Sequence, residues 1–277
     1  MSEGLLTLQE AAAQVGCHYM TLYRKVRSGE VEALVAGGRY RIHPEALQRW
    51  LEARPARRGA HRPADDDRDW AEHARHLEDS LVRGDESACR HAVERLVANG
   101  ADPVDLCERA LVPSLVRIGE RWAAGSLNVA EEHRASTIVL GLLGAIAPAF
   151  SRPGPRRGVA IVATPAGNAH GLPAAMVAAA LRADRFTVHN VGPDVPASDL
   201  ARLAVSAGAQ VGALSVAIAD PGYPQAREAV AALHGVGVPV MVGGRGIDAA
   251  GAREVGADRF GSDLREAQRL ARELVAA

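Results

Sequence analysis

The sequence predicts a multidomain chain of the α and α/β classes: a winged helix-turn-helix, then a four-helix bundle, then a doubly wound parallel sheet of the Rossmann-like kind. Two stretches without hydrophobic periodicity, at 54–67 and 151–157, separate the 277 residues into three blocks. The middle block has only helical periodicity, whereas the last alternates short apolar runs with helical segments. We therefore expect domains at 1–54, 68–150 and 158–277, with a linker at 55–67.

The composition is that of an ordinary globular protein. Hydrophobic residues make up 48% and charged residues 23%, which excludes a disordered chain. No apolar run approaches the roughly 18 residues that span a bilayer, and the first residues show no secretory signal. The cysteines are odd in number and have no metal-ligand spacing, so we expect a reduced, cytoplasmic location and burial as small hydrophobes rather than catalysis: Cys17, Cys89 and Cys107.

Charge is divided unevenly along the chain. Residues 1–63 contain ten Arg and Lys against six Asp and Glu, a net charge of +4, so the remainder carries -5 of the total of -1. A basic N-terminal segment, here called the head, followed by an acidic remainder indicates that the head is the part that binds a polyanion.

The first block predicts short helices and a hairpin. Thr7 and Glu10 have the spacing of a capping box, which marks a helix start. Residues 31–42 alternate in strand fashion around Gly37-Gly38, a hairpin turn. We expect helices over 8–16, 18–28 and 44–53.

Two helices around a tight turn, followed by an Arg-rich hairpin, are typical of a DNA-binding winged helix-turn-helix. The second helix would face a major groove, and the hairpin, or wing, would meet phosphates or the minor groove. Nearly the whole block, LTLQEAAAQVGCHYMTLYRKVRSGEVEALVAGGRYRIHPEALQRWL, resembles the excisionase-type branch of MerR-like winged-helix domains. The alternative is a three-helix domain that contacts protein. The expected DNA contacts are Tyr19, Thr21, Arg24 and Lys25 on the helix and Arg39, Tyr40 and Arg41 on the wing.

The middle block predicts an antiparallel four-helix bundle. Asn99-Gly100 and Ala124-Gly125 are helix stop signals, and the turns between the helical segments are short. The expected helices are 70–83, 87–99, 103–124 and 128–149.

The third block predicts a parallel sheet, because short buried strands alternate with helices. The expected strands are 159–163, 186–191, 211–216 and 238–242, with a weaker fifth at 259–260. The expected helices are 172–183, 197–207, 224–235, 247–255 and 263–276.

Residues with binding chemistry follow three of these strands. His170 lies on the loop after the first strand, Ser215 ends the third, and Gly243-Gly244 ends the fourth. In a doubly wound sheet the carboxyl ends of the strands meet at one edge, where ligands bind. A glycine pair at that edge allows a flat, bulky ligand to approach the backbone. The alternative for a loop histidine taken by itself is a solvated side chain.

This edge resembles the cobalamin-binding domain, whose signature is Asp-x-His-x-x-Gly, then Ser-x-Leu, then Gly-Gly. The resemblance implies that His170 coordinates cobalt from below, displacing the dimethylbenzimidazole base, and that Ser215 and the glycines line a channel for that base. The sequence departs from the signature at Asn168, where the acid usually stands, at Pro173 and at Ala217. The cofactor-binding residues implied are Asn168, His170, Gly171, Ser215, Val216, Gly243 and Gly244.

The end of the third predicted bundle helix and the start of the fourth resemble the helical cap of the CarH/LitR class of adenosylcobalamin-dependent photoreceptor regulators, whose pattern is Trp-x9-Glu-His. The resemblance implies that the indole covers the upper face of the corrin with the Glu-His pair nearby. Ala123 stands where light-sensing members often carry a histidine, so the light response is open. Corrinoid methyl-carrier proteins share the cap pattern. The matching residues are Trp122, Val129, Glu132 and His133.

Together these features predict a cobalamin-binding transcriptional regulator, not an enzyme, with adenosylcobalamin as the expected cofactor. We expect operator DNA as partner, repression as the mode, a homo-oligomer (dimer or tetramer) and no membrane contact. Two alternatives stay open: a corrinoid methyl carrier, and a winged-helix regulator whose sheet domain binds another ligand or only a protein.

Overall fold

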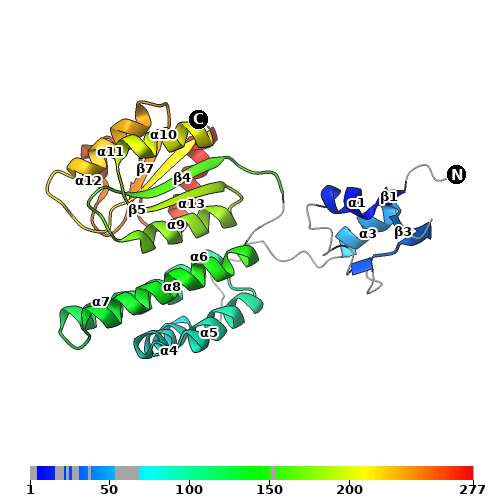
Figure 1. Ribbon diagram of the computed structural model, residues 1–277, viewed down its shortest axis with the longest axis horizontal. Coiled ribbons are helices and arrows are strands. Elements are labelled where there is room, and N and C mark those ends of the chain that lie inside the picture. The colour runs from blue at the N-terminus through cyan, green and yellow to red at the C-terminus, as the bar shows by residue number, and fades with distance from the viewer. Residues whose placement is uncertain are drawn as a thin grey trace. The chain divides into compact units, whose positions relative to one another are not determined.

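The computed structural model describes residues 5–15, 22, 25–26, 31–36, 39–53, 69–150 and 154–276. The chain forms two compact units, Met1–Asp67 and Arg68–Ala277 (Figure 1). Across the described residues, no helix has the length and apolar character needed to cross a membrane.

The first unit combines a small antiparallel sheet with helices. Thr7 and Glu10 form the predicted capping box: the Thr7 backbone N–H donates to Glu10 Oε2 at 2.8 Å, and the Glu10 N–H donates to Thr7 Oγ1 at 3.1 Å. The predicted hairpin is present, and a short strand that the sequence analysis did not predict pairs with it. Of the predicted second helix, only Leu22, Lys25 and Val26 lie inside the described residues, all helical. The elements are β1 (Leu6–Thr7), α1 (Leu8–Gln14), β2 (Leu34–Ala36), β3 (Arg39–Ile42) and α3 (Pro44–Ala53).

The second unit begins with the predicted helical bundle. Asp69, Asp85 and Asp102 accept a backbone N–H at three helix starts, which explains where those helices begin. The helices are α4 (Trp70–Arg83), α5 (Glu86–Ala98), α6 (Pro103–Leu106), a π-helical turn η1 (Cys107–Leu111), α7 (Val112–Ala123) and α8 (Val129–Phe150).

The helix predicted over 103–124 is helical from Pro103 to Ala123, but the π turn η1 interrupts its regular α-helical hydrogen bonding, which was not predicted. Pro113 has no N–H to donate to the turn before it, and a π turn accommodates such a gap. The buried Ser114 hydroxyl bonds to the Ala110 carbonyl at 2.8 Å and to the Ala74 carbonyl of α4 at 2.7 Å. This hydroxyl therefore ties the irregular turn to the neighbouring helix.

The sheet domain follows the predicted order. All five strands are parallel, in the order β5-β4-β6-β7-β8. Two hydrophobic cores lie on opposite faces, one with α9 and α13 and the other with α10, α11 and α12 (Figure 1). The strands are β4 (Val159–Pro165), β5 (Thr187–Val195), β6 (Val211–Ser215), β7 (Val240–Gly243) and β8 (Arg259–Gly261). The helices are α9 (Gly171–Ala183), α10 (Ala197–Ala207), α11 (Pro224–His234), α12 (Ala249–Glu254) and α13 (Leu264–Ala276).

The bundle packs on the outer side of α9. The bundle core includes Ala175, Met176, Ala179 and Ala183 of that helix. These small or flexible side chains allow a close approach of helices, so the bundle and the sheet domain share one apolar core.

Candidate functional site

The predicted ligand edge exists at the carboxyl ends of β4, β6 and β7. Ser215 ends β6 and pairs in register with Gly243, which ends β7. His170 follows β4 as the N-cap residue of α9, and it is exposed. The strand order reverses between β4 and β6, and this switch point is where doubly wound sheets bind ligands. The structure therefore brings these three residues to one edge.

A hydrogen-bonded network shapes the loop that carries His170. The Thr164 hydroxyl, which is 0% exposed, donates to the Asn168 carbonyl at 2.6 Å and accepts the Asp194 N–H at 3.1 Å. The Asp194 carboxylate accepts the Gly167 N–H at 2.8 Å. The sequence analysis missed Thr164 and Asp194, because they lie on different strands and neither belongs to the signature.

Asn168 serves this loop rather than the imidazole ring. Its Oδ1 accepts the backbone N–H of His170 at 3.2 Å, and the residue is buried. An aspartate would offer the same acceptor atom, so the amide preserves the loop geometry without the negative charge.

Ser215 has the features of a ligand-binding hydroxyl. The residue is 4% exposed, and none of the described residues hydrogen-bonds to its hydroxyl. Among the described residues, the fully buried side-chain atom that lacks a hydrogen-bond partner is Nη2 of Arg117, so the Ser215 oxygen is accessible from the sheet edge. A molecule bound at this edge can therefore reach the hydroxyl, and its place in the base channel stays a prediction.

The glycine pair has a structural reason that the sequence analysis did not find. A Cβ on Gly243 would lie 2.4 Å from the Gly261 carbonyl oxygen, and one on Gly244 would lie 2.3 Å from the Val216 carbonyl oxygen. The Val216 N–H also donates to the Gly243 carbonyl at 2.8 Å. Neighbouring backbone therefore already requires glycine at both positions, and contact of Gly243, Gly244 and Val216 with a cofactor stays a prediction. Gly171 is also confined, since its Cβ would lie 3.0 Å from Pro193 Cδ.

The second group of predicted residues lies around the turn between α7 and α8. Trp122 and Val129 are large apolar side chains that remain 48% and 50% exposed. Glu132 accepts a hydrogen bond from the Ser136 hydroxyl at 2.9 Å and lies 3.6 Å from His133 Nε2. Exposed apolar side chains next to polar ones are typical of a surface that a ligand covers.

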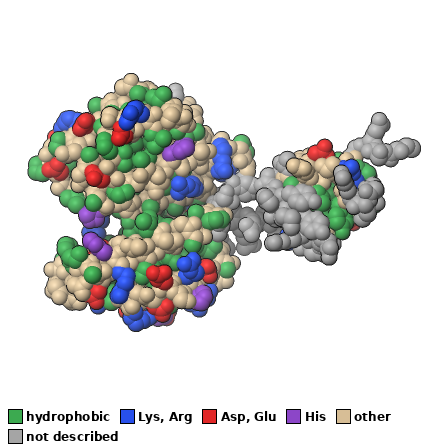
Figure 2. All heavy atoms as spheres, viewed as in Figure 1, with side chains coloured by type: hydrophobic (Ala, Val, Ile, Leu, Met, Phe, Trp, Pro, Cys, Tyr) green, Lys and Arg blue, Asp and Glu red, His purple; other side chains and the backbone are tan. Residues whose placement is uncertain are grey.

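Figure 2 shows a groove at the left between the sheet domain and the bundle, with histidine side chains on both walls. Across the part of the chain that the structure describes, no group of three or more His, Cys, Asp or Glu side chains is arranged to hold a metal ion. One histidine cannot hold a free metal ion, but it can supply one axial ligand to a metal whose other ligands belong to a macrocycle. The donor set therefore fits a corrinoid better than a bare metal.

The two cysteines that the structure describes are buried in the core of the bundle. Burial raises the pKa of Cys89 to about 11 and that of Cys107 to about 12. This confirms their predicted role as small hydrophobes, whereas Cys17 lies outside the described residues.

The predicted DNA contacts are only partly described. Lys25 is helical and half-buried, and Arg39, Tyr40 and Arg41 form part of β3. Tyr40 and Arg41 are half-buried. Tyr19, Thr21 and Arg24 lie outside the described residues, as does the turn at Gly37-Gly38.

Comparison with protein families assigns each part of the chain. Residues 5–55 match a helix-turn-helix domain. Residues 74–146 and 158–268 each match a B12 binding domain, by two different family models. The matches and the observed parallel sheet confirm the predicted fold class, and the two B12 matches support cobalamin as the cofactor.

Known proteins similar to this chain are corrinoid proteins. Dimethylamine corrinoid protein 2 of Methanosarcina mazei is 28% identical over 206 residues, which cover 72% of this chain and 95% of that protein. Trimethylamine corrinoid protein 1 of Methanosarcina acetivorans is 26% identical over 189 residues, 66% of this chain and 88% of that protein. The structure of a monomethylamine corrinoid protein from Methanosarcina barkeri superposes with a TM-score of 0.64 at 19% identity, covering 74% of this chain and 99% of that one. The shared fold is thus a cobalamin-binding one, preceded in this chain by a helix-turn-helix domain.

Proposed function

We propose that this protein is a cobalamin-dependent transcriptional regulator that binds operator DNA through its N-terminal domain. The observation that carries the proposal is the helix-turn-helix match at 5–55 in front of the two B12-binding matches. Since 72% of this chain spans 95% of a methylamine corrinoid protein, the chain has an additional part that a carrier of that size lacks.

In this proposal the residues of the sheet edge and of the bundle hold opposite faces of the cofactor. His170 would supply an imidazole nitrogen to the cobalt, and the Ser215 hydroxyl would bond to the part of the cofactor that enters the sheet domain. Trp122 and Val129 would exclude water from the side of the cofactor that faces the bundle, and the Glu132 carboxylate would accept hydrogen bonds from its hydroxyl groups. Bound adenosylcobalamin would supply a cobalt–carbon bond that light or ligand exchange can break.

In this proposal, the N-terminal domain binds DNA strongly only when several copies of the chain form an oligomer. A single winged helix-turn-helix binds a short DNA site weakly, and joining several heads in one oligomer raises the effective concentration of each at its site. If the cofactor favours one oligomer, operator affinity and cofactor binding are coupled. Tyr19, Thr21, Arg24 and Lys25 are the proposed major-groove contacts, with Arg39, Tyr40 and Arg41 on the wing. We propose repression as the mode.

The second candidate is a corrinoid methyl carrier, and the methylamine corrinoid relatives favour it. A carrier would be remethylated by a partner methyltransferase and would show no operator binding. The regulator would bind operator DNA with an affinity that changes on addition of adenosylcobalamin.

The first test is cofactor retention, measured as the absorption spectrum of protein that has been incubated with adenosylcobalamin in the dark and desalted. We expect the wild type to retain cobalamin and His170→Ala to lose at least ten-fold in affinity. His91→Ala, which changes an exposed histidine of α5, is the matched control and should bind as the wild type does. A colourless wild type would contradict the proposal.

The second test is operator binding, measured by mobility shift with and without adenosylcobalamin, in the dark and after green light. Equal shifts under all conditions would remove the cobalamin-dependent regulator, and the absence of any shift would leave the carrier. A lasting spectral change on illumination would show that the protein also senses light, even though Ala123 stands where light-sensing members often carry a histidine.

A further inference from the structure

A polar contact, separate from the cofactor edge, joins the bundle to the sheet domain. Glu108 Oε1, in η1, accepts the backbone N–H of Leu264, the first residue of α13, at 2.6 Å. Next to it, Arg265 Nη2 donates to Asp105 Oδ1 of α6 at 2.5 Å and lies 3.7 Å from Asp102 Oδ1. We call these five residues the latch.

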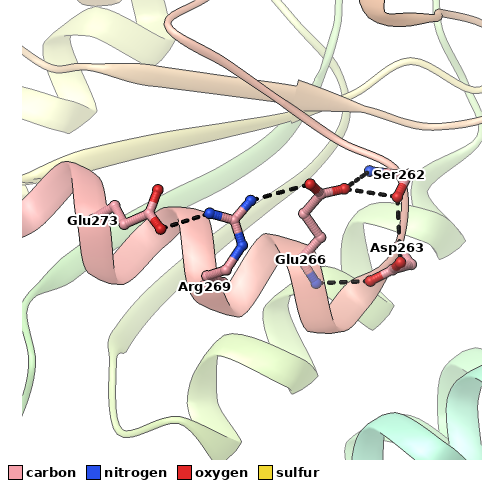
Figure 3. Close-up of polar contacts among 5 residues, drawn as sticks. All are labelled: Ser262, Asp263, Glu266, Arg269 and Glu273. Carbon is pink, nitrogen blue, oxygen red and sulfur yellow. Dashed lines mark hydrogen bonds and ion pairs between the residues drawn. The ribbon is translucent and has the colours of Figure 1, made fainter.

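The bundle thereby completes the cap of a helix that belongs to the other domain. The first N–H groups of a helix lack partners within it, and α13 meets part of this need locally: the Glu266 N–H donates to Asp263 Oδ1 at 2.7 Å. Glu266 in turn accepts the N–H and hydroxyl of Ser262, at 2.8 and 2.7 Å (Figure 3). The remaining Leu264 N–H goes to Glu108, whose carboxylate lies at the positive end of the helix dipole.

The helix that receives the latch is stiffened along its surface. Arg269 bonds to Glu266 one turn before it, at 3.1 Å, and to Glu273 one turn after it, at 2.6 Å (Figure 3). Gln268 adds a bond from α13 to the Ala180 carbonyl of α9 at 2.7 Å. The latch therefore attaches the bundle to a helix that carries its own ion pairs and bonds to α9.

The latch lies at the start of the helical run that leads to Trp122 and at the start of the helix that follows β8. On the bundle side, the helical run from Glu108 to Trp122 is about 21 Å long at 1.5 Å per residue, so a small rotation at η1 moves the indole by ångströms. On the sheet side, α13 follows directly from β8, and the carbonyl of Gly261 in β8 fills the space beside Gly243. Burial raises the pKa of the Glu108 carboxyl, which agrees with its enclosed position between the two domains.

We propose that Glu108 and Arg265 are positioning residues for the cofactor site: they hold the bundle at one orientation on α13 and so set the height of Trp122 above the corrin. The proposal rests on the proposed cofactor site, but the contact itself is tested without cofactor.

Two variants separate the hydrogen bond from the charge. Glu108→Gln keeps an oxygen that accepts the Leu264 N–H, whereas Glu108→Ala removes it. Glu120→Ala is the matched control, because Glu120 is an exposed carboxylate on the same helical run and the described residues give its side chain no hydrogen bond. Arg265→Ala tests the latch from the opposite side.

The cofactor-free measurement is hydrogen exchange of the Leu264 amide. We expect at least ten-fold faster exchange in Glu108→Ala and near wild-type exchange in Glu108→Gln and Glu120→Ala. Equal exchange in the wild type and Glu108→Ala would overturn the latch, whether or not cobalamin binds.

The cofactor-loaded measurement is the rate at which cyanide replaces the upper ligand of bound hydroxocobalamin. Glu108→Ala and Arg265→Ala should react several-fold faster, and Glu108→Gln should react as the wild type does. In all three variants the absorption spectrum that reports ligation by His170 should be unchanged. Unchanged rates in both Ala variants, or a Gln variant as fast as Ala, would overturn the positioning role. If the wild type does not retain cobalamin, the proposed function fails, and the exchange result still decides the latch.

Discussion

Thr164 shows how one residue outside any signature shapes the candidate site. Its hydroxyl bridges two segments that are far apart in the sequence, the carbonyl of Asn168 and the N–H of Asp194. Asp194 has a positive φ of 57°, a left-handed conformation that costs energy for a residue other than glycine. The backbone of the His170 loop is therefore held by side-chain bonds in addition to its backbone bonds, such as that from the Asp194 N–H to the Asn168 carbonyl.

Replacing this hydroxyl should weaken both the fold and the site. Thr164→Val keeps the shape but removes the hydroxyl that joins the Asn168 carbonyl to the Asp194 N–H, and that N–H then has only its bond to the Asn168 carbonyl. We therefore expect a loss of about 1–3 kcal/mol in the free energy of unfolding, together with weaker cobalamin retention. Urea denaturation and spectral titration measure the two effects. Thr187→Val, at an exposed position at the start of β5, is the control. Stability equal to that of the control variant would refute the role given to Thr164.

At the scale of elements, a buried carboxylate ties α4 to the helix that ends at the cap. Glu78 Oε2 lies 2.5 Å from Arg117 Nε, and its Oε1 lies 3.1 Å from Arg121 Nη1. Arg121 precedes Trp122, so this ion-pair cluster, together with the latch at the other end, determines where α7 lies. The Glu78 side chain is mostly buried, whereas the two arginines are partly exposed.

Removal of this carboxylate should loosen α7. Glu78→Ala leaves two arginines without their acceptor, and we expect a loss of about 2 kcal/mol in the free energy of unfolding, reduced from the value for fully buried pairs because solvent screens the arginines. Thermal unfolding by circular dichroism measures it. Glu94→Ala, which changes an exposed glutamate of α5, should unfold as the wild type does. A Glu78→Ala chain as stable as Glu94→Ala would mean that the cluster contributes nothing.

At the scale of the whole molecule, the two compact units divide the proposed functions. Met1–Asp67 has its own core around Leu22, Ile42 and Trp50, and Arg68–Ala277 contains both B12-binding matches. Cofactor binding and DNA binding should therefore be separable, although their coupling requires the full chain.

A chain of residues 68–277 should retain cobalamin with the affinity of the full protein and lose operator binding entirely. The physical reason is that each unit buries its own apolar surface, so removal of the head exposes no core of the second unit. Absorption after desalting and mobility shift are the measurements, with the full chain as reference. Operator binding by residues 68–277 would contradict the role assigned to the head.

Much of the fold was predictable from the sequence because its signals are local. The capping box of Thr7, apolar periodicity and glycine stops act within a few residues, and they predicted the order of the helices and strands. The π turn η1 was not predicted, and its tie to α4, the bond from the Ser114 hydroxyl to the Ala74 carbonyl, joins residues 40 positions apart.

The sequence by itself determined which chemistry the chain carries: an imidazole at 170, a hydroxyl at 215, an indole at 122 and a basic head in front of them. Only the tertiary structure decided how these groups are held. The Thr164–Asp194 bond and the Glu108–Leu264 latch join segments 30 and 156 residues apart. Such contacts leave no periodic pattern in a sequence, since a hydrogen bond needs only one donor and one acceptor that folding brings within about 3 Å.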